Sequence, residues 1–393
     1  MTPRLLILCN AFDDATRIER GVTTDSPAGS RKVLLLAQAL RKGAVSPWVL
    51  SLGRGRAGGK AKFYRACVRR IGGVPVVYAP FVTVPVLSEF VSLVAMIPIV
   101  LRLRKARIKG ALFYNRLTAY LPSLFVAAAC GYRRFLDLED GEVRAGQPSL
   151  RARARAVVGR IYDRMCPDGA LLACSALNDW TKIRPTLCYY GTAVGDASVQ
   201  RFTSGRLHIL MGGALLPETG ADLLIDAIGQ LRVAQAPWAQ NIQFEVTGQG
   251  VSLARFRELE VDQRFPLVRV HGRTTDKVYR QILASCDVGL ALKLNEGALA
   301  HTTFPSKVIE FAAAGLLVLS TDISDVRKVM GEDGAVYLRK DDAGALNELF
   351  ELLLMAPDRA KAIAQNGFMR AQEQCDPLRA GQTIARFLFG EQL

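Results

Sequence analysis

The sequence predicts an α/β fold with two tandem domains, each built on a parallel sheet. The chain has 393 residues, half of them hydrophobic, which suits two domains of nearly 200 residues with a core each. Short apolar runs typical of buried strands alternate with stretches of helical spacing, as in parallel sheets with crossover helices. This pattern restarts near residue 200, so the join is expected around residues 193–205.

The expected elements follow one another in a regular order. The first half should contain helices at 30–43 and 121–131, and strands at 4–9, 48–52, 111–115, 134–140, 169–175 and 187–191. The second half should contain helices at 221–231, 277–286 and 305–314, and strands at 206–213, 243–250, 267–272, 288–294 and 316–321. These are two Rossmann-like sets. We therefore expect domains at 1–198 and 199–375, with a last helix in 376–393 that crosses back to the first domain.

The two halves differ in charge. Residues 1–200 hold 30 Lys and Arg against 13 Asp and Glu, a net charge of +17, whereas residues 201–393 have a net charge of −2. A basic surface in one half indicates an anionic partner such as membrane phospholipid, a phosphorylated lipid or nucleic acid. The basic half lacks a recognisable nucleic-acid-binding motif, and its aromatic residues are not interleaved with the basic runs. We therefore expect no nucleic-acid partner.

An apolar segment is followed directly by a basic one. Residues 86–101 are apolar apart from interruptions that include Glu89 and Pro98, and they are shorter than the about 20 apolar residues of a membrane-spanning helix. The basic stretch RLRKARIKG follows. This order is typical of a helix that lies in the bilayer interface with its cations on anionic headgroups. The alternative is a core helix with a solvated basic end.

The eight cysteines do not indicate a metal site. They are scattered, with no C-x-x-C pair and no histidine close enough for a zinc knuckle. We expect buried free thiols in a reducing compartment, and neither a metal nor a bound cofactor.

The start of the helix within residues 301–315 is a candidate anion site. Pro305 suits the first helical position, and a helix start offers free backbone N–H groups and a positive dipole end. Lys307 adds a positive charge, and Glu310, one turn later, can accept both hydroxyls of a ribose. The alternative is that Glu310 merely faces solvent. The candidate ligand-binding residues here are Thr302, Thr303, Ser306, Lys307 and Glu310, with His301 as a candidate catalytic donor.

Three glycine-containing turns are further candidates for ligand binding. They hold Gly213 in GGALLPETG, Gly248 in TGQG, and Gly29 with Ser30 in SPAGSRK. Glycine permits close approach of the backbone to a ligand. None of them matches G-x-G-x-x-G or the P-loop pattern, which disfavours dehydrogenases and NTPases.

Two further strand ends carry polar residues. In the first half, DLEDGE begins at Asp137, and its carboxylates can orient an acceptor hydroxyl, act as a base or hold a metal. Asp140 is the favoured candidate and Glu139 the second; turn formation or pairing with nearby Arg133 or Arg134 is the alternative. In the second half, VHGR places Gly272 and Arg273 where they could meet a base or a phosphate.

The order of these parts resembles GT-B glycosyltransferases of the large retaining family that uses nucleotide-sugar donors, glycosyl transferases group 1, family 4-like. The match covers nearly all of the second half through MGGALLPETGADLLIDAI, FEVTGQG, VRVHGRTTDKVYRQILASCDVGLAL and FPSKVIEFAAAGLLVLSTDISDVRKV. The first half matches more loosely. The resemblance implies two Rossmann-like domains with the active site in the cleft between them. It also implies that Glu310 binds the donor's ribose, that Gly272–Arg273 lie near the base, and that Gly29–Ser30 face donor phosphates or acceptor.

The sequence departs from the family pattern at three positions. The family's pair of glutamates with seven residues between them keeps only the second, because Thr302 stands at the place of the first. Ala214 and Thr219 stand where the family often has Arg and Lys to hold the diphosphate. Lys307 is the best replacement cation.

The resemblance implies a retaining, metal-independent glycosyltransferase of hexosyltransferase type. Helix dipoles and cations would stabilise the leaving diphosphate. With the basic first half, we expect a lipid-linked or growing polysaccharide acceptor, a role in cell-surface polysaccharide biosynthesis, and a cytoplasmic protein bound peripherally to the inner face of the cytoplasmic membrane. Two alternatives stay open: a GT-B sugar-nucleotide epimerase, and a non-catalytic GT-B-shaped partner subunit of a transferase.

Overall fold

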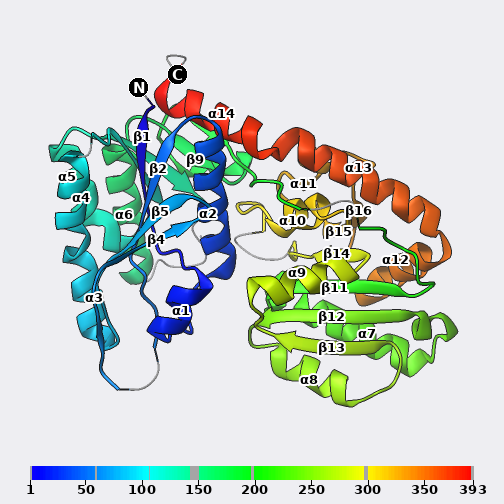
Figure 1. Ribbon diagram of the computed structural model, residues 1–393. Helices are drawn as coiled ribbons and strands as arrows, with labels where there is room; N and C mark the ends of the chain where they lie inside the picture. Colours follow the sequence, from blue (N-terminus) through cyan, green and yellow to red (C-terminus); the bar gives the residue numbers. More distant parts are fainter. Residues whose placement is uncertain are drawn as a thin grey trace. The chain divides into compact units, whose positions relative to one another are not determined.

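The computed structural model describes residues 2–57, 60–105, 107–141, 150–195, 199–295 and 300–390. The chain forms two compact units, Met1–Thr192 with Pro377–Leu393, and Ala193–Asp376 (Figure 1). The change from unit 1 to unit 2 therefore comes six residues before the expected boundary at 198/199. Unit 1 is discontinuous in sequence, because its last segment follows the whole of unit 2.

Unit 1 is built on an eight-stranded sheet. The strand order is β10-β9-β8-β7-β1-β2-β5-β4, and every pair is parallel except the hairpin of β4 and β5. The strands are β1 (Arg4–Cys9), β2 (Ser46–Ser51), β4 (Cys67–Ile71), β5 (Val74–Tyr78), β7 (Gly110–Tyr114), β8 (Arg133–Leu138), β9 (Ala170–Leu172) and β10 (Thr186–Cys188), with a separate two-stranded ribbon of β3 (Phe63–Tyr64) and β6 (Phe81–Val82).

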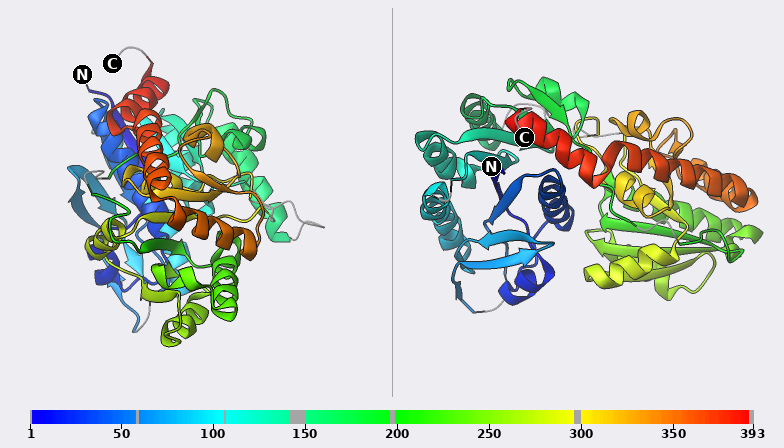
Figure 2. Two further views of the ribbon diagram at one scale, coloured as in Figure 1. Left: turned by 90° about the vertical axis from the view of Figure 1, so that its right-hand side faces the viewer. Right: turned by 45° about the horizontal axis from the view of Figure 1, so that its top comes forward.

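The helices of unit 1 are α1 (Asp14–Arg20), α2 (Pro27–Lys42), α3 (Pro85–Val94), α4 (Met96–Lys105), α5 (Leu121–Ala129), α6 (Leu150–Met165) and α14 (Pro377–Phe389), with short 3₁₀ turns η1 (Thr118–Tyr120) and η2 (Ser175–Trp180). Helix α14 lies against α2 (Figures 1 and 2). The two helices approach closely at Gly43 and Gly381, where a Cβ on Gly381 would lie 1.9 Å from the carbonyl oxygen of Ala39. Leu388 and Ile384 of α14 join the buried core of the eight-stranded sheet.

The apolar segment of unit 1 is longer as a helix than its sequence suggests. Residues Pro85–Lys105 form one helical segment, α3 and α4 with a turn at Ala95, and this segment is long and apolar enough to cross a membrane by length and composition. The expectation of too short a span is wrong here. Pro98 does not end the helix: it lies in the first turn of α4, shortly after the turn at Ala95.

Unit 2 is built on a six-stranded, fully parallel sheet of order β13-β12-β11-β14-β15-β16. Its strands are β11 (Leu207–Ala214), β12 (Ile242–Gln249), β13 (Leu267–Gly272), β14 (Val288–Ala291), β15 (Leu317–Thr321) and β16 (Val336–Leu338). Its helices are α7 (Ala221–Ala234), α8 (Leu253–Val261), α9 (Asp276–Ser285), α10 (Lys307–Ala313), α11 (Val326–Met330), α12 (Ala343–Met355) and α13 (Pro357–Cys375), with η3 (Pro217–Thr219) and η4 (Pro237–Asn241).

The core of unit 2 follows from alternation along the strands. Ile209 and Met211 of β11 and Phe244 and Val246 of β12 point to the face that α7 and α12 cover, where Phe244 and Phe350 meet edge-on with ring centroids 5.4 Å apart. A parallel sheet places all its carboxyl ends along one edge, so the residues after each strand gather there.

Candidate functional site

Two glycines bring the ends of β11 and β12 close together in unit 2. Gly213 and Gly248 are paired in register and have φ of +111° and +120°. A Cβ on Gly248 would lie 1.8 Å from the carbonyl oxygen of Gly213, so the position admits only glycine. A Cβ on Gly213 would lie 3.4 Å from Cε of Lys307. The predicted Gly213 and Gly248 thus form a shallow backbone surface beside the Lys307 side chain.

Lys307 is the centre of a polar cluster at this edge. Its Nζ donates to Oε2 of Glu310 at 2.7 Å and to Oη of Tyr279 at 3.0 Å, and lies 4.8 Å from the centroid of the Tyr279 ring. Burial opposes the charge on Lys307, but Glu310 and Tyr279 together outweigh it and hold the lysine pKa above its ordinary value. The side chains are partly accessible, 23% for Lys307 and 12% for Glu310. The cluster therefore combines a charged cation and a carboxylate that a ligand can reach.

The helix that carries these residues begins later than the sequence predicts. Helix α10 begins at Lys307 with Ser306 as its cap, and no side chain caps it. The prediction of Pro305 as the first helical residue is wrong by two positions. Thr302 and Thr303 before it are buried, and Nζ of Lys293 donates to Oγ1 of Thr303, which fixes the chain ahead of the helix.

Two residues of this region, Tyr279 and Lys293, were not predicted from the sequence. Tyr279 comes from the middle of α9, and nothing in its helical spacing marks it. Because the predicted strand 288–294 extends past Ala291, where β14 ends, Lys293 fell inside the predicted strand and not after it. Its side chain reaches Thr303, and its backbone N–H and C=O both bond to Oγ1 of Thr321.

Thr219, at a departure from the family pattern, is engaged in its own turn. Its Oγ1 donates to the carbonyl oxygen of Ala214 at 2.6 Å and accepts from the backbone N–H of Leu216 at 3.1 Å. Thr219 therefore stabilises the turn after β11, and this position provides no positive charge for a diphosphate.

The remaining predicted residues of unit 2 lie at other points. Gly272 ends β13 with φ of +63°, followed by the half-buried Arg273. His271 has a structural partner, because its Nε2 lies 2.6 Å from Oε2 of Glu245, a buried carboxylate that also accepts from Gln243. His301 is exposed.

In unit 1, the acidic strand end forms a second polar cluster. Glu139 pairs with Lys32 of α2, and its backbone N–H donates to Oδ1 of Asn115 at 3.2 Å. Asp137 is buried, whereas Asp140 is exposed. The structure thus brings Glu139 into the cluster in place of the favoured Asp140; Glu142 lies outside the described residues. Among the described acids of this stretch, none pairs with Arg133 or Arg134: the Arg133 side chain pairs with Asp168, and the Arg134 side chain donates to the carbonyl oxygens of Met165 and Tyr132.

Burial governs the protonation of this cluster. It raises the pKa of Asp137, and it raises the pKa of Glu139 to about 7 although the Lys32 ammonium opposes the shift. The pKa of Lys32 is raised as well, because Glu139 and Asp137 outweigh the effect of its own burial.

Gly29 and Ser30 lie in the first turn of α2 and not in a loop. The cap residue Ser26 accepts from the N–H of Gly29 at 3.1 Å. The buried Ser30 Oγ accepts from the N–H of Phe12 at 2.9 Å, which gives this side chain a structural role. A Cβ on Gly29 would lie 3.1 Å from Oη of Tyr114, so glycine keeps α2 close to the end of β7.

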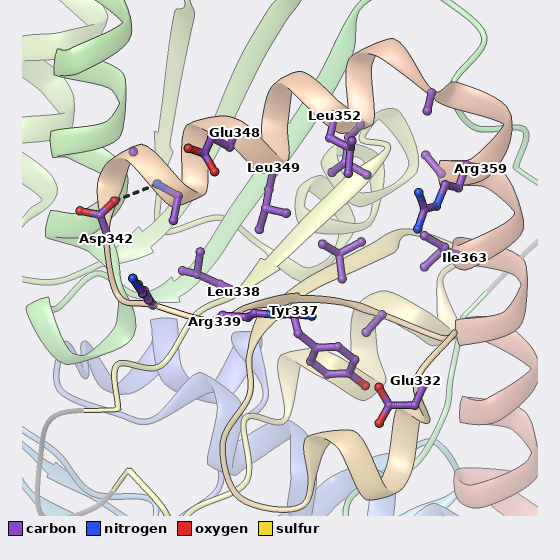
Figure 3. Close-up of a pocket in the computed structure, with 18 of the residues that line it drawn as sticks. Glu332, Tyr337, Leu338, Arg339, Asp342, Glu348, Leu349, Leu352, Arg359 and Ile363 are labelled. Carbon is purple, nitrogen blue, oxygen red and sulfur yellow. Dashed lines mark hydrogen bonds between the residues drawn. The ribbon is translucent and has the colours of Figure 1, made fainter.

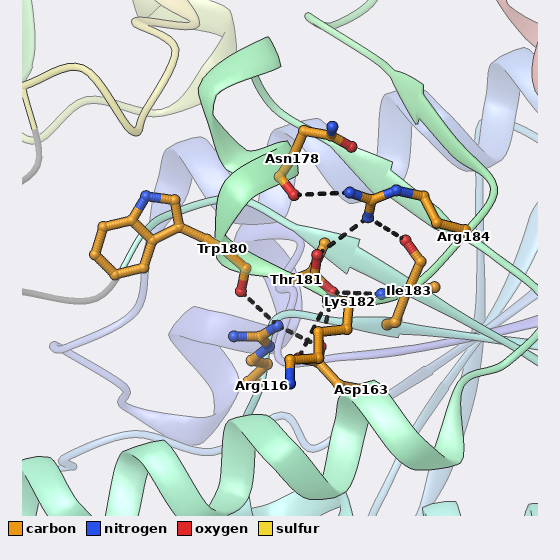
Figure 4. A network of polar contacts seen from close by, with 8 residues as sticks. All are labelled: Arg116, Asp163, Asn178, Trp180, Thr181, Lys182, Ile183 and Arg184. Atoms are coloured by element: carbon orange, nitrogen blue, oxygen red, sulfur yellow. Dashed lines mark hydrogen bonds and ion pairs between the residues drawn. The ribbon is translucent and has the colours of Figure 1, made fainter.

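A hydrogen-bond network fixes the chain that follows β7 (Figure 4). Arg116 donates to Oδ1 of Asp163 at 2.6 Å and to the carbonyl oxygen of Trp180 at 3.0 Å, and Thr181 also donates to Asp163. The Trp180 ring points away from these contacts. The network joins the segment after β7 to α6 and η2, next to Asn115.

A groove of about 720 Å³ lies in unit 2 along β16, α12 and the start of α13 (Figure 3). None of the predicted site residues lines it, and its Arg327 is paired with Asp322 and Glu332. Across the described ranges, no group of three His, Cys, Asp or Glu side chains is placed to hold a metal ion.

The two parallel-strand units match solved structures of one fold class. HepE from Anabaena, solved with UDP, matches with a TM-score of 0.65 and 15% identity, over 98% of this chain and 99% of that one. Sucrose-phosphate synthase from Thermosynechococcus elongatus matches with a TM-score of 0.67 and 14% identity, over 98% of both chains. The fold is GT-B, with two Rossmann-like domains, as expected.

The match to a sequence family lies in the second unit. Residues 206–355 match the model of the family described as Glycosyl transferases group 1, which confirms the resemblance for this part of the chain. A phosphatidylinositol N-acetylglucosaminyltransferase GPI3 subunit of Saccharomyces cerevisiae is 22% identical over 178 residues, 44% of this chain and 36% of that protein. The match thus spans little more than a third of that relative's length.

Proposed function

We propose that the protein is a retaining glycosyltransferase that moves a hexose from a nucleotide-diphosphate sugar to an acceptor hydroxyl. The observation that carries this proposal is the Lys307–Glu310 pair beside Gly213 and Gly248, in a glycosyl transferases group 1 domain. Transfer breaks the bond between the anomeric carbon and the diphosphate, so negative charge builds up on the leaving group. Lys307 is held charged where it can stabilise that charge, and Glu310 can accept the ribose hydroxyls.

Lys293 supports the same assignment. Because Ala214 and Thr219 supply no cation, the diphosphate needs positive charge from elsewhere. Lys293 and Lys307 are both partly buried in the described region, which strengthens their interaction with an anion relative to solvated lysines. Two lysines can provide this charge without a metal ion. HepE was solved with UDP, so UDP-sugars are the first donors to test.

We assign the acceptor to unit 1 and to a membrane surface. Helices α3, α4 and α5 pack on one another and expose large apolar side chains: Val86, Leu87, Phe90, Val94, Leu101 and Phe125. The end of α4 and the residues after it add exposed cations: Arg102, Lys105, Arg107 and Lys109. Exposed apolar side chains with adjoining cations complement an anionic bilayer. A lipid-linked or growing glycan at the inner face of the cytoplasmic membrane, in cell-surface polysaccharide biosynthesis, is the acceptor proposed.

One relative favours a lipid acceptor. The yeast relative is named as a phosphatidylinositol N-acetylglucosaminyltransferase subunit, that is, for transfer to a lipid. A sugar-nucleotide epimerase would act on a soluble substrate and would leave the apolar surface of unit 1 without a role.

The donor site is tested by thermal denaturation with UDP, GDP, TDP and ADP. We expect one nucleotide to raise the Tm of the wild type, and Glu310→Ala to abolish this rise because the ribose loses its acceptor. The matched control is Glu373→Ala, an exposed glutamate of α13, which should respond like the wild type. A rise in Tm that survives Glu310→Ala would place the nucleotide elsewhere.

A second candidate is a non-catalytic partner subunit of a transferase. The observation in its favour is that Thr302, Ala214 and Thr219 occupy positions where the family has charged ligands. The absence of any nucleotide effect in the same experiment would make this the better assignment.

A further inference from the structure

Asp137 is a buried carboxyl without a hydrogen-bond donor. It is 1% exposed near the end of β8, and among the described residues neither of its carboxyl oxygens has a hydrogen-bond partner. An ionised carboxylate in such a place is strongly disfavoured, and the group takes up a proton instead. Its side-chain neighbour is the carboxyl of Glu139, which can exchange a hydrogen bond with it only if one of the two is protonated.

The charged groups around Asp137 and Glu139 also indicate that one of the two carboxyls is protonated. From α2, Lys32 pairs with Glu139, and its Nζ lies 5.3 Å from the centroid of the Tyr189 ring. From β7, Tyr114 faces the cluster, and Cys9 of β1 lies near Tyr114; burial keeps both neutral by raising the pKa of each. Asp140, after β8, is exposed to solvent. One buried cation balances one buried anion, so the second carboxyl is neutral.

We propose that Asp137 and Glu139 hold a single proton between them at neutral pH, and that this proton controls how Glu139 accepts the acceptor hydroxyl in unit 1. Glu139 is the partner that a substrate can touch, because its side chain is 14% exposed while Asp137 is enclosed. Asp137 and Lys32 are positioning residues that act through Glu139. With one proton on the pair, Glu139 is a carboxylate that accepts an O–H strongly; with two protons, at acid pH, it is a neutral carboxyl and a much weaker acceptor and base.

The shared proton is tested without any substrate. Infrared difference spectra of the full chain across a pH titration should contain a carboxylic-acid C=O band at neutral pH. Asp137→Asn and Glu139→Gln should each remove it, since a single carboxyl beside Lys32 ionises. Asp140→Asn, at the exposed neighbouring acid, is the matched control and should keep the band. A neutral-pH spectrum without the band, or a band that both variants retain, would overturn the shared proton.

A further variant, in which the band should increase, distinguishes a change in protonation from a loss of folding. Lys32→Met removes the balancing cation, so both carboxyls should be protonated at neutral pH and the band should grow about twofold. An unchanged band in a folded Lys32→Met protein, as judged by circular dichroism, would also contradict the proposal.

The role of the pair toward the acceptor rests on the proposed function and has its own readout. Asp137→Leu removes the protonated carboxyl that donates to Glu139, so the pKa of Glu139 should rise and the acid limb of kcat/KM should move to higher pH by roughly one unit. A merely structural role would lower kcat/KM equally at all pH values, and an unmoved acid limb would contradict control of the acceptor. If the protein transfers no sugar at all, the infrared result still decides whether the proton is shared.

Discussion

Arg201 is a buried cation that joins two helix ends in unit 2. Its guanidinium donates to the carbonyl oxygens of Leu283, Ala284 and Cys286 at the end of α9, and to that of Ala314 at the end of α10. Helix C-termini carry unpaired carbonyls and partial negative charge, which a buried arginine satisfies. Arg201 thereby fixes the far end of the helix that starts at Lys307.

We expect Arg201→Gln to lower the free energy of unfolding by about 3 kcal/mol, because it leaves buried carbonyls without donors. Urea denaturation followed by circular dichroism measures this difference.

The matched control for Arg201 is Arg280→Gln on α9. Arg280 is exposed, so its replacement should change the unfolding free energy by less than about 0.5 kcal/mol. Equal effects of the two substitutions would show that the contacts of Arg201 contribute nothing specific.

At the scale of single residues, the sequence predicted the parts of the candidate site that depend on local order. Gly213 and Gly248 lie at the ends of strands, and Lys307 and Glu310 lie in the first turn of a helix. The structure brings Gly213 and Glu310 to the same lysine. Tyr279 could not be predicted, because its part depends on how α9 packs on the sheet. For the same reason the sequence favoured Asp140 over Glu139: only the packing of α2 brings Lys32 to one of them.

At the scale of elements, the pair of α2 and α14 depends on two glycines. Gly43 and Gly381 let the backbones touch, and a side chain at either would meet the other's main chain. We expect Gly381→Ala to destabilise the protein by about 1–3 kcal/mol, because the new methyl group meets rigid backbone. Equilibrium urea denaturation of wild type and variant gives the difference.

Gly229, inside α7, is the opposite case and serves as the control. A Cβ there meets nothing within 4 Å, so Gly229→Ala should stabilise the protein by roughly 0.5–1 kcal/mol through the higher helix propensity of alanine. A Gly381→Ala variant as stable as wild type would mean that α14 shifts freely on α2.

The elements that the sequence predicted are those with strong apolar runs. All strands of unit 2 except β16 were predicted, together with β1, β2 and β7 to β10 of unit 1. The hairpin of β4 and β5 was missed, because β4 contains Arg69 and Arg70 and exposes every second residue. Strand β16 was missed because it has only three residues and its place at the sheet edge is set by pairing with β15.

At the scale of the whole molecule, the excess positive charge lies in the first half of the chain, where α3, α4 and α5 also expose apolar side chains. We expect the protein to co-sediment with vesicles of anionic phospholipid and to dissociate as salt is raised, since the cations at the end of α4 meet the headgroups. Arg102→Gln combined with Lys105→Gln should lower the partition coefficient about tenfold or more, at roughly 1 kcal/mol for each cation.

The control for this prediction is a double variant that removes two positive charges from unit 2. Arg359 and Lys361 are exposed on α13, and replacing both by Gln should leave vesicle binding unchanged. Equal losses in the two double variants would indicate a response to total charge, and binding that is insensitive to both would contradict a membrane role for the α4 cations.

The discontinuity of unit 1 has a consequence for how the protein is made on the ribosome. Unit 2 is a continuous stretch, and its two ends are joined by a bond of 2.7 Å from the N–H of Ala193 to the carbonyl oxygen of Cys375. It can therefore close as soon as its own last residues emerge. Unit 1 is translated first, yet its core lacks Ile384 and Leu388 until α14 has been synthesised. Unit 1 is thus synthesised first but completes its core last. The nascent first unit therefore needs protection from aggregation for the whole time that unit 2 is being translated.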